Sequence, residues 1–152
     1  MIKLNVGAGE DCLGEYINID IRNLEEIDII SDLSKCNLPF LPKSVDEIKA
    51  IDVIEHFSHK TSIKVLKYLI SLLKKGGLIF IQCPDVLKLY EILKDNPREL
   101  IRRLYGDQDY PENTHKTGFT LLILEYLFVE LGLEIVDKNY INGNLRIKGR
   151  KL

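Results

Sequence analysis

The sequence of 152 residues has no tryptophan, one methionine and only three cysteines, Cys12, Cys36 and Cys83. The number of cysteines is odd and none forms a C-x-x-C pair, so we expect reduced thiols rather than a disulfide framework. The most apolar run, Leu121 to Val129, is too short to cross a bilayer and is interrupted by Glu125. The start of the chain does not have the layout of a signal peptide. These absences predict a cytoplasmic protein without a membrane segment.

The chain also lacks a strong charge of either sign, because its formal net charge is -2. A dedicated nucleic-acid binder normally carries a large positive field, so we expect no nucleic-acid partner. The hydrophobic share of 45% is sufficient for a substantial core, and the charged share of 29% suits a soluble surface. A chain of this length predicts a single domain over residues 1–152.

A glycine turn near the N-terminus is the first candidate for a ligand site. Residues 2–6 are typical of a short strand, and Gly7, Ala8 and Gly9 follow it. Residues 16–20 are typical of a second strand, which ends at Asp20. An acid at the carboxyl end of such a strand commonly binds ribose hydroxyls. The pattern therefore predicts a nucleoside-containing cofactor, although a tight turn in an ordinary α/β protein is the alternative.

The third glycine of a dinucleotide fingerprint is absent, and Glu10 and Asp11 stand after Gly9. Two carboxylates would repel a pyrophosphate, which such turns otherwise hold at a helix N-terminus. S-adenosylmethionine carries a sulfonium and an ammonium group and has no phosphate, so it suits this turn better.

The rest of the chain alternates between strand and helix patterns. Further strands are predicted at 27–31, 47–51, 78–81, 134–137 and 144–148. Helices are predicted from a cap at Ser58 or Thr61 to a stop at Gly76 and Gly77, and at 85–94, 97–105 and 120–131. Residues 10–16 leave room for one helical turn or a loop. The alternation predicts an α/β fold with a mostly parallel sheet and helices on its faces, and with strand 78–81 covered on both sides.

Four stretches together resemble the class I S-adenosylmethionine-dependent methyltransferases, most closely small bacterial and archaeal members with the type 11 pattern. They are Leu4–Gly9, Asn18–Asp20, Ile51–Phe57 and Leu73–Ile81. A fifth, residues 115–120, resembles a subgroup often linked to surface-glycan biosynthesis. The resemblance implies a Rossmann-like, mostly parallel seven-stranded sheet with an antiparallel C-terminal hairpin. It also implies methyl transfer from S-adenosylmethionine to a small-molecule or glycan-type acceptor.

The resemblance also implies roles for individual residues. Those assigned to the cofactor are Gly7, Ala8 and Gly9 at the methionine moiety, Asp20 at the ribose, Ile21, Asp32 and Leu33 at the adenine, and Asp52 near the methionine amino group. The residues themselves give Asp32 two alternatives, a partner for the adenine amino group or a cap for the next turn. The sequence departs from the family pattern by lacking the third glycine and most of the first helix.

Candidate reactive groups lie later in the chain. His115, in the polar loop 107–118, is a candidate general base, and its alternative is packing under the final helix. Glu55 and His56 are predicted to border the substrate entrance. A metal site built on His56 and His59 is the less favoured interpretation, so no metal is predicted. Tyr110 is a candidate acceptor contact or part of a solvated loop.

Two other functions and one structural question stay open at this level. The chain is either an active methyltransferase or a non-catalytic module that binds S-adenosylmethionine or a nucleoside, and a nucleotide-dependent oxidoreductase is a weaker third alternative. The run from Leu121 to Val129 predicts either a fully covered helix or a homodimer interface. Arg146, Lys148 and Arg150 alternate with apolar residues, which favours the solvated face of a strand.

Overall fold

One seven-stranded sheet organises the chain, in the strand order β3-β2-β1-β4-β5-β7-β6. The computed structural model describes all of residues 1–152. The strands are β1 (Lys3–Val6), β2 (Ile17–Asp20), β3 (Ile29–Ile30), β4 (Val45–Ile51), β5 (Leu73–Pro84), β6 (Leu133–Ile141) and β7 (Asn144–Lys151). The first five are parallel, and β7 pairs antiparallel with both β5 and β6. The predicted sheet and C-terminal hairpin are confirmed.

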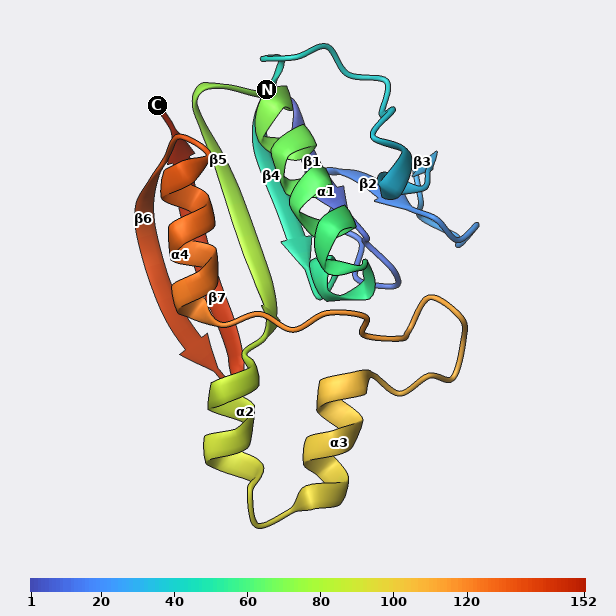
Figure 1. Cartoon of the computed structure of the whole chain (residues 1–152). Helices are drawn as coiled ribbons and strands as arrows, with labels where there is room; N and C mark the ends of the chain where they lie inside the picture. The colour runs from blue at the N-terminus through green and yellow to red at the C-terminus, as the bar shows by residue number, and fades with distance from the viewer.

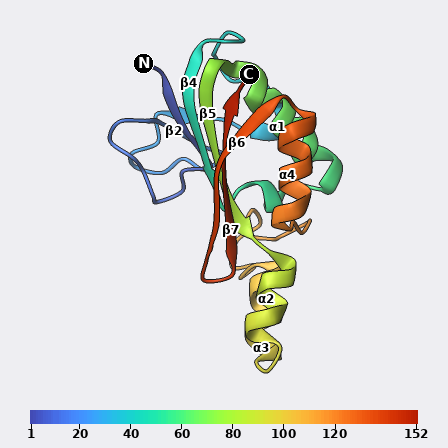
Figure 2. The same cartoon turned by 90° about the vertical axis from the view of Figure 1, so that its left-hand side faces the viewer.

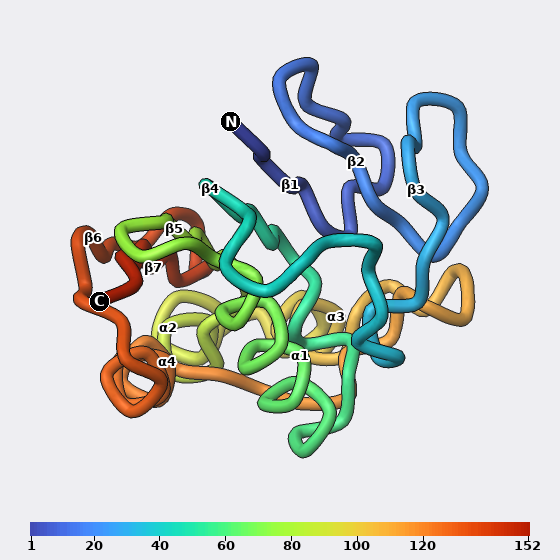
Figure 3. Tube along the Cα trace, turned by 90° about the horizontal axis from the view of Figure 1, so that it is seen from above, coloured from blue at the N-terminus to red at the C-terminus, as the bar shows by residue number.

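Four helices and two 3-10 turns complete the fold. They are η1 (Leu33–Lys35), η2 (Ile54–His56), α1 (His59–Leu72), α2 (Val86–Leu93), α3 (Pro97–Tyr105) and α4 (Leu121–Glu130). Helices α1 and α4 lie on the same face of the sheet, while α2 and α3 extend beyond the carboxyl ends of β4 and β5 (Figures 1, 2 and 3). None of the helices is long and apolar enough to span a membrane.

The hydrophobic core lies between the sheet and the two helices α1 and α4. It consists of one cluster of 25 buried apolar residues. In β4 and β5, Ile48 and Ile79 have no exposed surface, and Phe128 of α4 is equally buried. Burying such side chains stabilises a fold by about 1.5–3 kcal/mol each, so this layer holds the strands that carry the site.

The opposite face of the sheet is polar, which corrects the expectation of helices on both faces. Cross-strand neighbours there include Lys3 with Glu47, and Gln82 with Arg146. Phe80, within the run predicted to be covered on both sides, is only half-buried. The physical reason is that loops rather than helices connect β1 to β2 and β2 to β3. Arg146 and Lys148 are partly exposed between buried neighbours in β7, as predicted.

Two buried asparagines replace the missing first helix. Asn5 Nδ2 donates to Asn18 Oδ1 at 3.0 Å and to the Asp11 carbonyl at 3.0 Å. Asn18 Oδ1 also accepts from the Leu13 N–H at 2.9 Å. These side chains satisfy the backbone of the crossing loop, whose polar groups would otherwise lack partners. Of the two predicted alternatives for residues 10–16, the loop is therefore the correct one.

Two other expectations change in detail. The first long helix ends at Leu72, before Gly76 and Gly77, because Leu73 already pairs with Val45 of β4. Helix α4 is not fully covered, because Leu122 and Tyr126 are 58% and 68% exposed. The homodimer interface remains a prediction for this helix.

Asp85 connects three parts of the chain beside the carboxyl edge. It is 1% exposed, and its Oδ1 accepts from the Lys88 N–H at 2.9 Å at the start of α2. Its Oδ2 accepts from the Leu121 N–H at 2.7 Å at the start of α4. One carboxylate therefore N-caps α2 and adds a second acceptor at the start of α4, whose own N-cap is Thr120.

We predict that Asp85→Ala lowers the free energy of unfolding by about 2–4 kcal/mol, because each lost cap costs about 1–2 kcal/mol. Urea denaturation followed by circular dichroism measures the change. Asp95→Ala, at an exposed position, is the control and leaves the midpoint unchanged. A loss no larger than that of the control would contradict the double-cap role.

Candidate functional site

A cavity of about 570 Å³ lies at the carboxyl ends of β1, β2 and β4. Eight of the sequence-predicted site residues line it: Gly7, Asp20, Ile21, Asp32, Leu33, Asp52, His56 and Tyr110. Open α/β sheets bind ligands at this edge, and the volume is in the usual range for small-molecule pockets. Ala8, Gly9, Glu55 and His115 are outside its lining.

Gly7 allows the turn after β1 to approach β4 closely. Its φ is +65°, and a Cβ added there would stand 2.4 Å from Cγ2 of Val53. An L-residue would be strained in this conformation and would also collide with a buried side chain. The narrow space between β1 and β4 therefore requires glycine at this position.

Asp20 lines the cavity and binds the backbone of Gly9. Its Oδ2 accepts from the Gly9 N–H at 2.8 Å, and its Oδ1 accepts from Arg22 N at 2.8 Å and Arg22 Nε at 3.3 Å. A carboxylate offers about four acceptor sites, so one site on Oδ2 stays free for a hydroxyl donor. Gly9 does not line the cavity but holds the Asp20 carboxylate, which does. Ala8 is buried and donates its N–H to the Ile19 carbonyl.

Asp32 performs the structural role that the sequence offered as an alternative. Its Oδ1 accepts from the Ser34 N–H at 2.9 Å and caps η1. Hydrogen bonding to Ser34 lowers the pKa of this carboxyl group, so it is charged at neutral pH. Because Asp32 also lines the cavity, its cap role is compatible with a contact to a ligand.

Arg22 and Tyr110 close one side of the cavity, and Arg22 was not identified from the sequence. The Arg22 guanidinium carbon lies 4.6 Å from the centre of the Tyr110 ring, which is a cation–π contact. Loop 106–120, which carries Tyr110, runs past the carboxyl ends of the strands (Figure 1). The only signal in the sequence was the position of Arg22 two residues after the predicted ribose-binding acid.

A second, more polar cavity of about 330 Å³ adjoins the first. Asp52, His56 and Tyr110 line both cavities. The second cavity also contains Glu55, His115 and several polar residues from α3 and its surroundings, among them Arg102, Arg103, Asn113 and Asn144. The site therefore has two compartments that meet at Asp52 and His56.

Asp52 stands at the junction in an unusual backbone conformation. Its φ is +53°, and its carboxylate accepts from Gln82 Nε2 at 3.3 Å. Gln82 Oε1 in turn accepts from Arg146 Nε at 2.7 Å, so a polar chain from the open face of the sheet supports Asp52. Desolvation raises the pKa of Asp52 even though the side chain borders a cavity. Strained residues of this kind often occur at functional sites.

Glu55 is a buried carboxyl group without a hydrogen-bond partner. It is 2% exposed, and neither of its side-chain oxygens has a partner. Burial raises its pKa well above the ordinary value, and the nearby Asp52 carboxylate adds to this effect. The backbone N–H groups of Glu55 itself and of Val53 lower this pKa, but by less than burial raises it. Buried charged groups are normally paired, so this carboxyl group requires an explanation.

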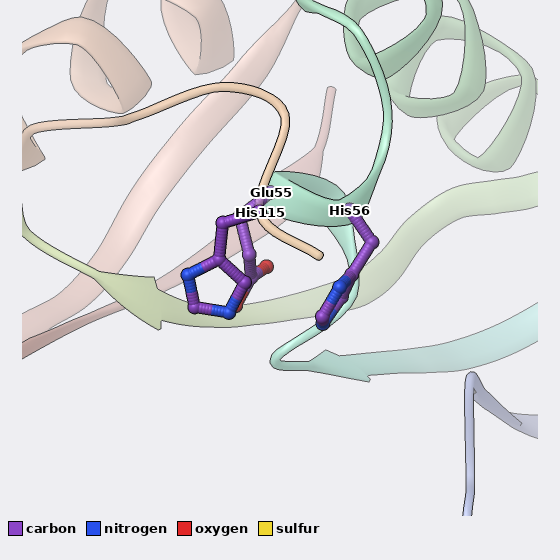
Figure 4. A group of neighbouring side chains, drawn as sticks. All are labelled: Glu55, His56 and His115. Carbon is purple, nitrogen blue, oxygen red and sulfur yellow. The ribbon is translucent and has the colours of Figure 1, made fainter. Parts of the chain in front are cut away.

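His56 and His115 lie beside Glu55. The two ring centres are 4.9 Å apart and the rings are nearly perpendicular. Figure 4 shows both imidazoles next to the Glu55 side chain, with Glu55 and His56 on η2 and His115 on the loop before α4. His59 is exposed on α1, so the H-x-x-H spacing does not bring its two histidines together.

Backbone contacts hold this arrangement in place. The N–H of His115 donates to the Tyr105 carbonyl at 3.0 Å, and the N–H of Lys116 donates to the Glu55 carbonyl at 2.8 Å. His56 Nδ1 is 3.3 Å from the Thr114 carbonyl. Burial lowers the pKa of both histidines, so the neutral imidazole is favoured.

The comparisons with known proteins identify the fold. No protein-family model matches the sequence, and no curated protein matches it. A methyltransferase of Archaeoglobus fulgidus is 18% identical, with a TM-score of 0.69 over 98% of this chain and 85% of its own. One from Methanosarcina mazei is also 18% identical, with a TM-score of 0.68 over 99% and 92%. Both are described as dependent on S-adenosylmethionine.

A third solved structure contains ligands. It is the 1,6-didemethyltoxoflavin N1-methyltransferase of Burkholderia thailandensis with its substrate and S-adenosylhomocysteine bound. It is 14% identical, with a TM-score of 0.67 over 99% of this chain and 70% of its own. This chain has the fold of the class I S-adenosylmethionine-dependent methyltransferases.

We predict that Gly7→Ala lowers the free energy of unfolding by about 2–4 kcal/mol, because a left-handed L-residue costs about 1–2 kcal/mol and overpacking about 1–3 kcal/mol. Gly14→Ala is the matched control, because nothing lies within 4 Å of a Cβ at that position. Urea denaturation of the two variants measures the difference. Equal free energies of unfolding for the two variants would contradict the requirement for glycine at position 7.

Proposed function

We propose that the protein transfers a methyl group from S-adenosylmethionine to a polar small-molecule or glycan-type acceptor. The observation that carries this proposal is the pair of adjoining cavities at the carboxyl edge of a methyltransferase fold. Methyl transfer needs two ligands in contact, and most of its acceleration comes from aligning them. A module that only binds the cofactor needs no second compartment.

The larger cavity suits the cofactor. Asp20 has a free acceptor site that would suit a ribose hydroxyl, and Asp32 and Leu33, which line the same cavity, would flank the adenine. Asp52, which lines both cavities, would offer its carboxylate to the methionine ammonium group. When bound, S-adenosylmethionine supplies a methyl group already activated by its sulfonium. The exposed Ile21 side chain adds an apolar contact beside Asp20.

The smaller cavity suits a polar acceptor. Arg103 Nη2 donates to Asn144 Oδ1 at 2.9 Å and has no carboxylate partner, so a positive charge faces the compartment. Arg102 differs, because Glu99 and Asp107 both pair with it. Tyr110 borders the acceptor compartment and the cofactor compartment, as expected of a substrate contact. Hydroxyl-rich or anionic acceptors match these donors better than apolar ones.

His115 keeps its predicted role as the candidate general base for a hydroxyl acceptor. Its lowered pKa favours the neutral ring, which is the form that accepts a proton. Glu55 lines the smaller cavity with this ring, and His56 lines both cavities. We propose these three as the residues closest to the reacting atoms.

We predict that Asp20→Asn weakens binding of S-adenosylmethionine by about 10- to 100-fold, because a hydrogen bond to a charged group contributes about 1.5–3 kcal/mol. Calorimetric titration measures the affinity for S-adenosylmethionine and S-adenosylhomocysteine. The control is Asp11→Asn, which removes the same charge from an exposed position beside the turn. Equal affinity of both variants would refute the ribose contact.

We also predict that the chain forms S-adenosylhomocysteine when it is given a suitable polar acceptor. A panel of hydroxylated metabolites and nucleotide sugars, with methyl-labelled cofactor, measures transfer. Binding of the cofactor with no transfer over the whole panel would favour a non-catalytic module. Binding of a nicotinamide cofactor without S-adenosylmethionine would instead revive the oxidoreductase interpretation.

A further inference from the structure

Glu55, His56 and His115 combine three features that the cofactor site does not explain. Their ligand-type atoms all lie within 4.8 Å of one another. The Glu55 carboxyl group is buried and has no hydrogen-bond partner. The three residues come from two segments far apart in the sequence, η2 and the loop before α4 (Figure 4).

The geometry points to a metal centre: we propose that Glu55, His56 and His115 bind a divalent first-row transition-metal ion such as Zn²⁺. Two imidazoles and one carboxylate are a common ligand set for such ions, both at catalytic zinc and at non-haem iron sites. Mg²⁺ and Ca²⁺ prefer oxygen ligands, so the two histidines disfavour them.

The unpartnered carboxylate is the strongest argument for this site. An isolated buried acid must either take up a proton or find a cation. No lysine or arginine reaches Glu55, because the ion pairs of the structure involve other acids. A metal ion between the three side chains would supply the missing partner for both oxygens.

The surroundings of the histidines also fit metal binding. His56 Nδ1 faces the Thr114 carbonyl at 3.3 Å, so it carries the hydrogen and leaves the Nε2 lone pair free. Histidine ligands of metals typically donate their second N–H to a backbone carbonyl in this way.

Only a small movement is needed to close the site. Ligand atoms around a tetrahedral Zn²⁺ lie about 3.3 Å apart for bonds of about 2.0 Å. The separations of up to 4.8 Å therefore have to shorten by rotation of the side chains. Gly106 lets this loop approach α3 closely, since a Cβ there would be 2.4 Å from the Asn113 carbonyl oxygen and 3.2 Å from the His115 ring.

Three protein ligands leave coordination positions open. All three residues line the smaller cavity, and Asp52 borders it beside them. An oxygen atom of the acceptor would occupy an open position, a statement that rests on the proposed function. The metal site itself does not depend on that function.

The test is a titration of metal-free full-length protein with Co²⁺, followed by visible absorption and calorimetry. We expect one Co²⁺ per chain, with ligand-field bands in the visible region and competition by Zn²⁺. His115→Ala and Glu55→Gln should each weaken Co²⁺ binding by more than about 100-fold, since even outer-shell changes cost 10- to 100-fold. His59→Ala is the matched control, because it removes the one histidine outside the cluster.

Several outcomes overturn the proposal. They are no Co²⁺ binding by the folded wild-type protein, equal binding by wild type and His115→Ala, and loss of binding in His59→Ala. Thiolate charge-transfer bands would assign the metal to Cys12 or Cys36 instead. Circular dichroism confirms that each variant is folded, and His56→Ala provides a third ligand variant.

The metal proposal and the proposed function fail independently. Co²⁺ binding without S-adenosylmethionine binding would retain the metal site and remove the methyltransferase activity. Methyl transfer by a protein that binds no Co²⁺, lost in His115→Ala, would instead retain the proposed function with His115 as a general base and end the metal proposal.

Discussion

The hydrogen bond between Asn5 and Asn18 is the constraint on which the carboxyl edge of β1 and β2 depends. A parallel crossover usually needs a helix to satisfy its backbone and cover the sheet. Here two buried amide side chains hold the loop after β1 against β1 and β2. The loop therefore places the Gly9 N–H within hydrogen-bond distance of Asp20, which lines the cavity. Without this network, a sheet with one open face would have no fixed edge at which to bind a ligand.

The open face of the sheet and the two-compartment site are linked through β5 and β7. Gln82 belongs to the polar face, yet it donates to Asp52 and accepts from Arg146. A covering helix would have made this position apolar, as in parallel sheets with both faces buried. The polar face therefore contributes directly to the site, because it supports the carboxylate at the junction of the two cavities.

Much of the fold was predictable because its signals are local. The glycine turn, the acid at the end of β2 and the Asn142–Gly143 hairpin each depend on neighbouring residues, and all three are present. The coverage of the sheet was not predictable in the same way. Phe80 lies in an apolar run, and only the absence of early helices leaves it half-exposed. The double cap by Asp85 and the contact of Arg22 with Tyr110 join distant segments, so no spacing in the sequence reveals them.

The cluster of Glu55, His56 and His115 shows the same limit for function. His56 and His59 are close in sequence, and their H-x-x-H spacing is compatible with a metal-binding motif. In the structure, His59 lies at the exposed start of α1. His115, in the loop before α4, lies beside Glu55 and His56 instead. That loop is fixed because the Glu55 carbonyl accepts from the backbone of Lys116 and Thr117. The residue that carries the unpartnered carboxyl group thus also positions the loop that completes the cluster, and the short 3-10 turn η2 contributes side chains to both cavities.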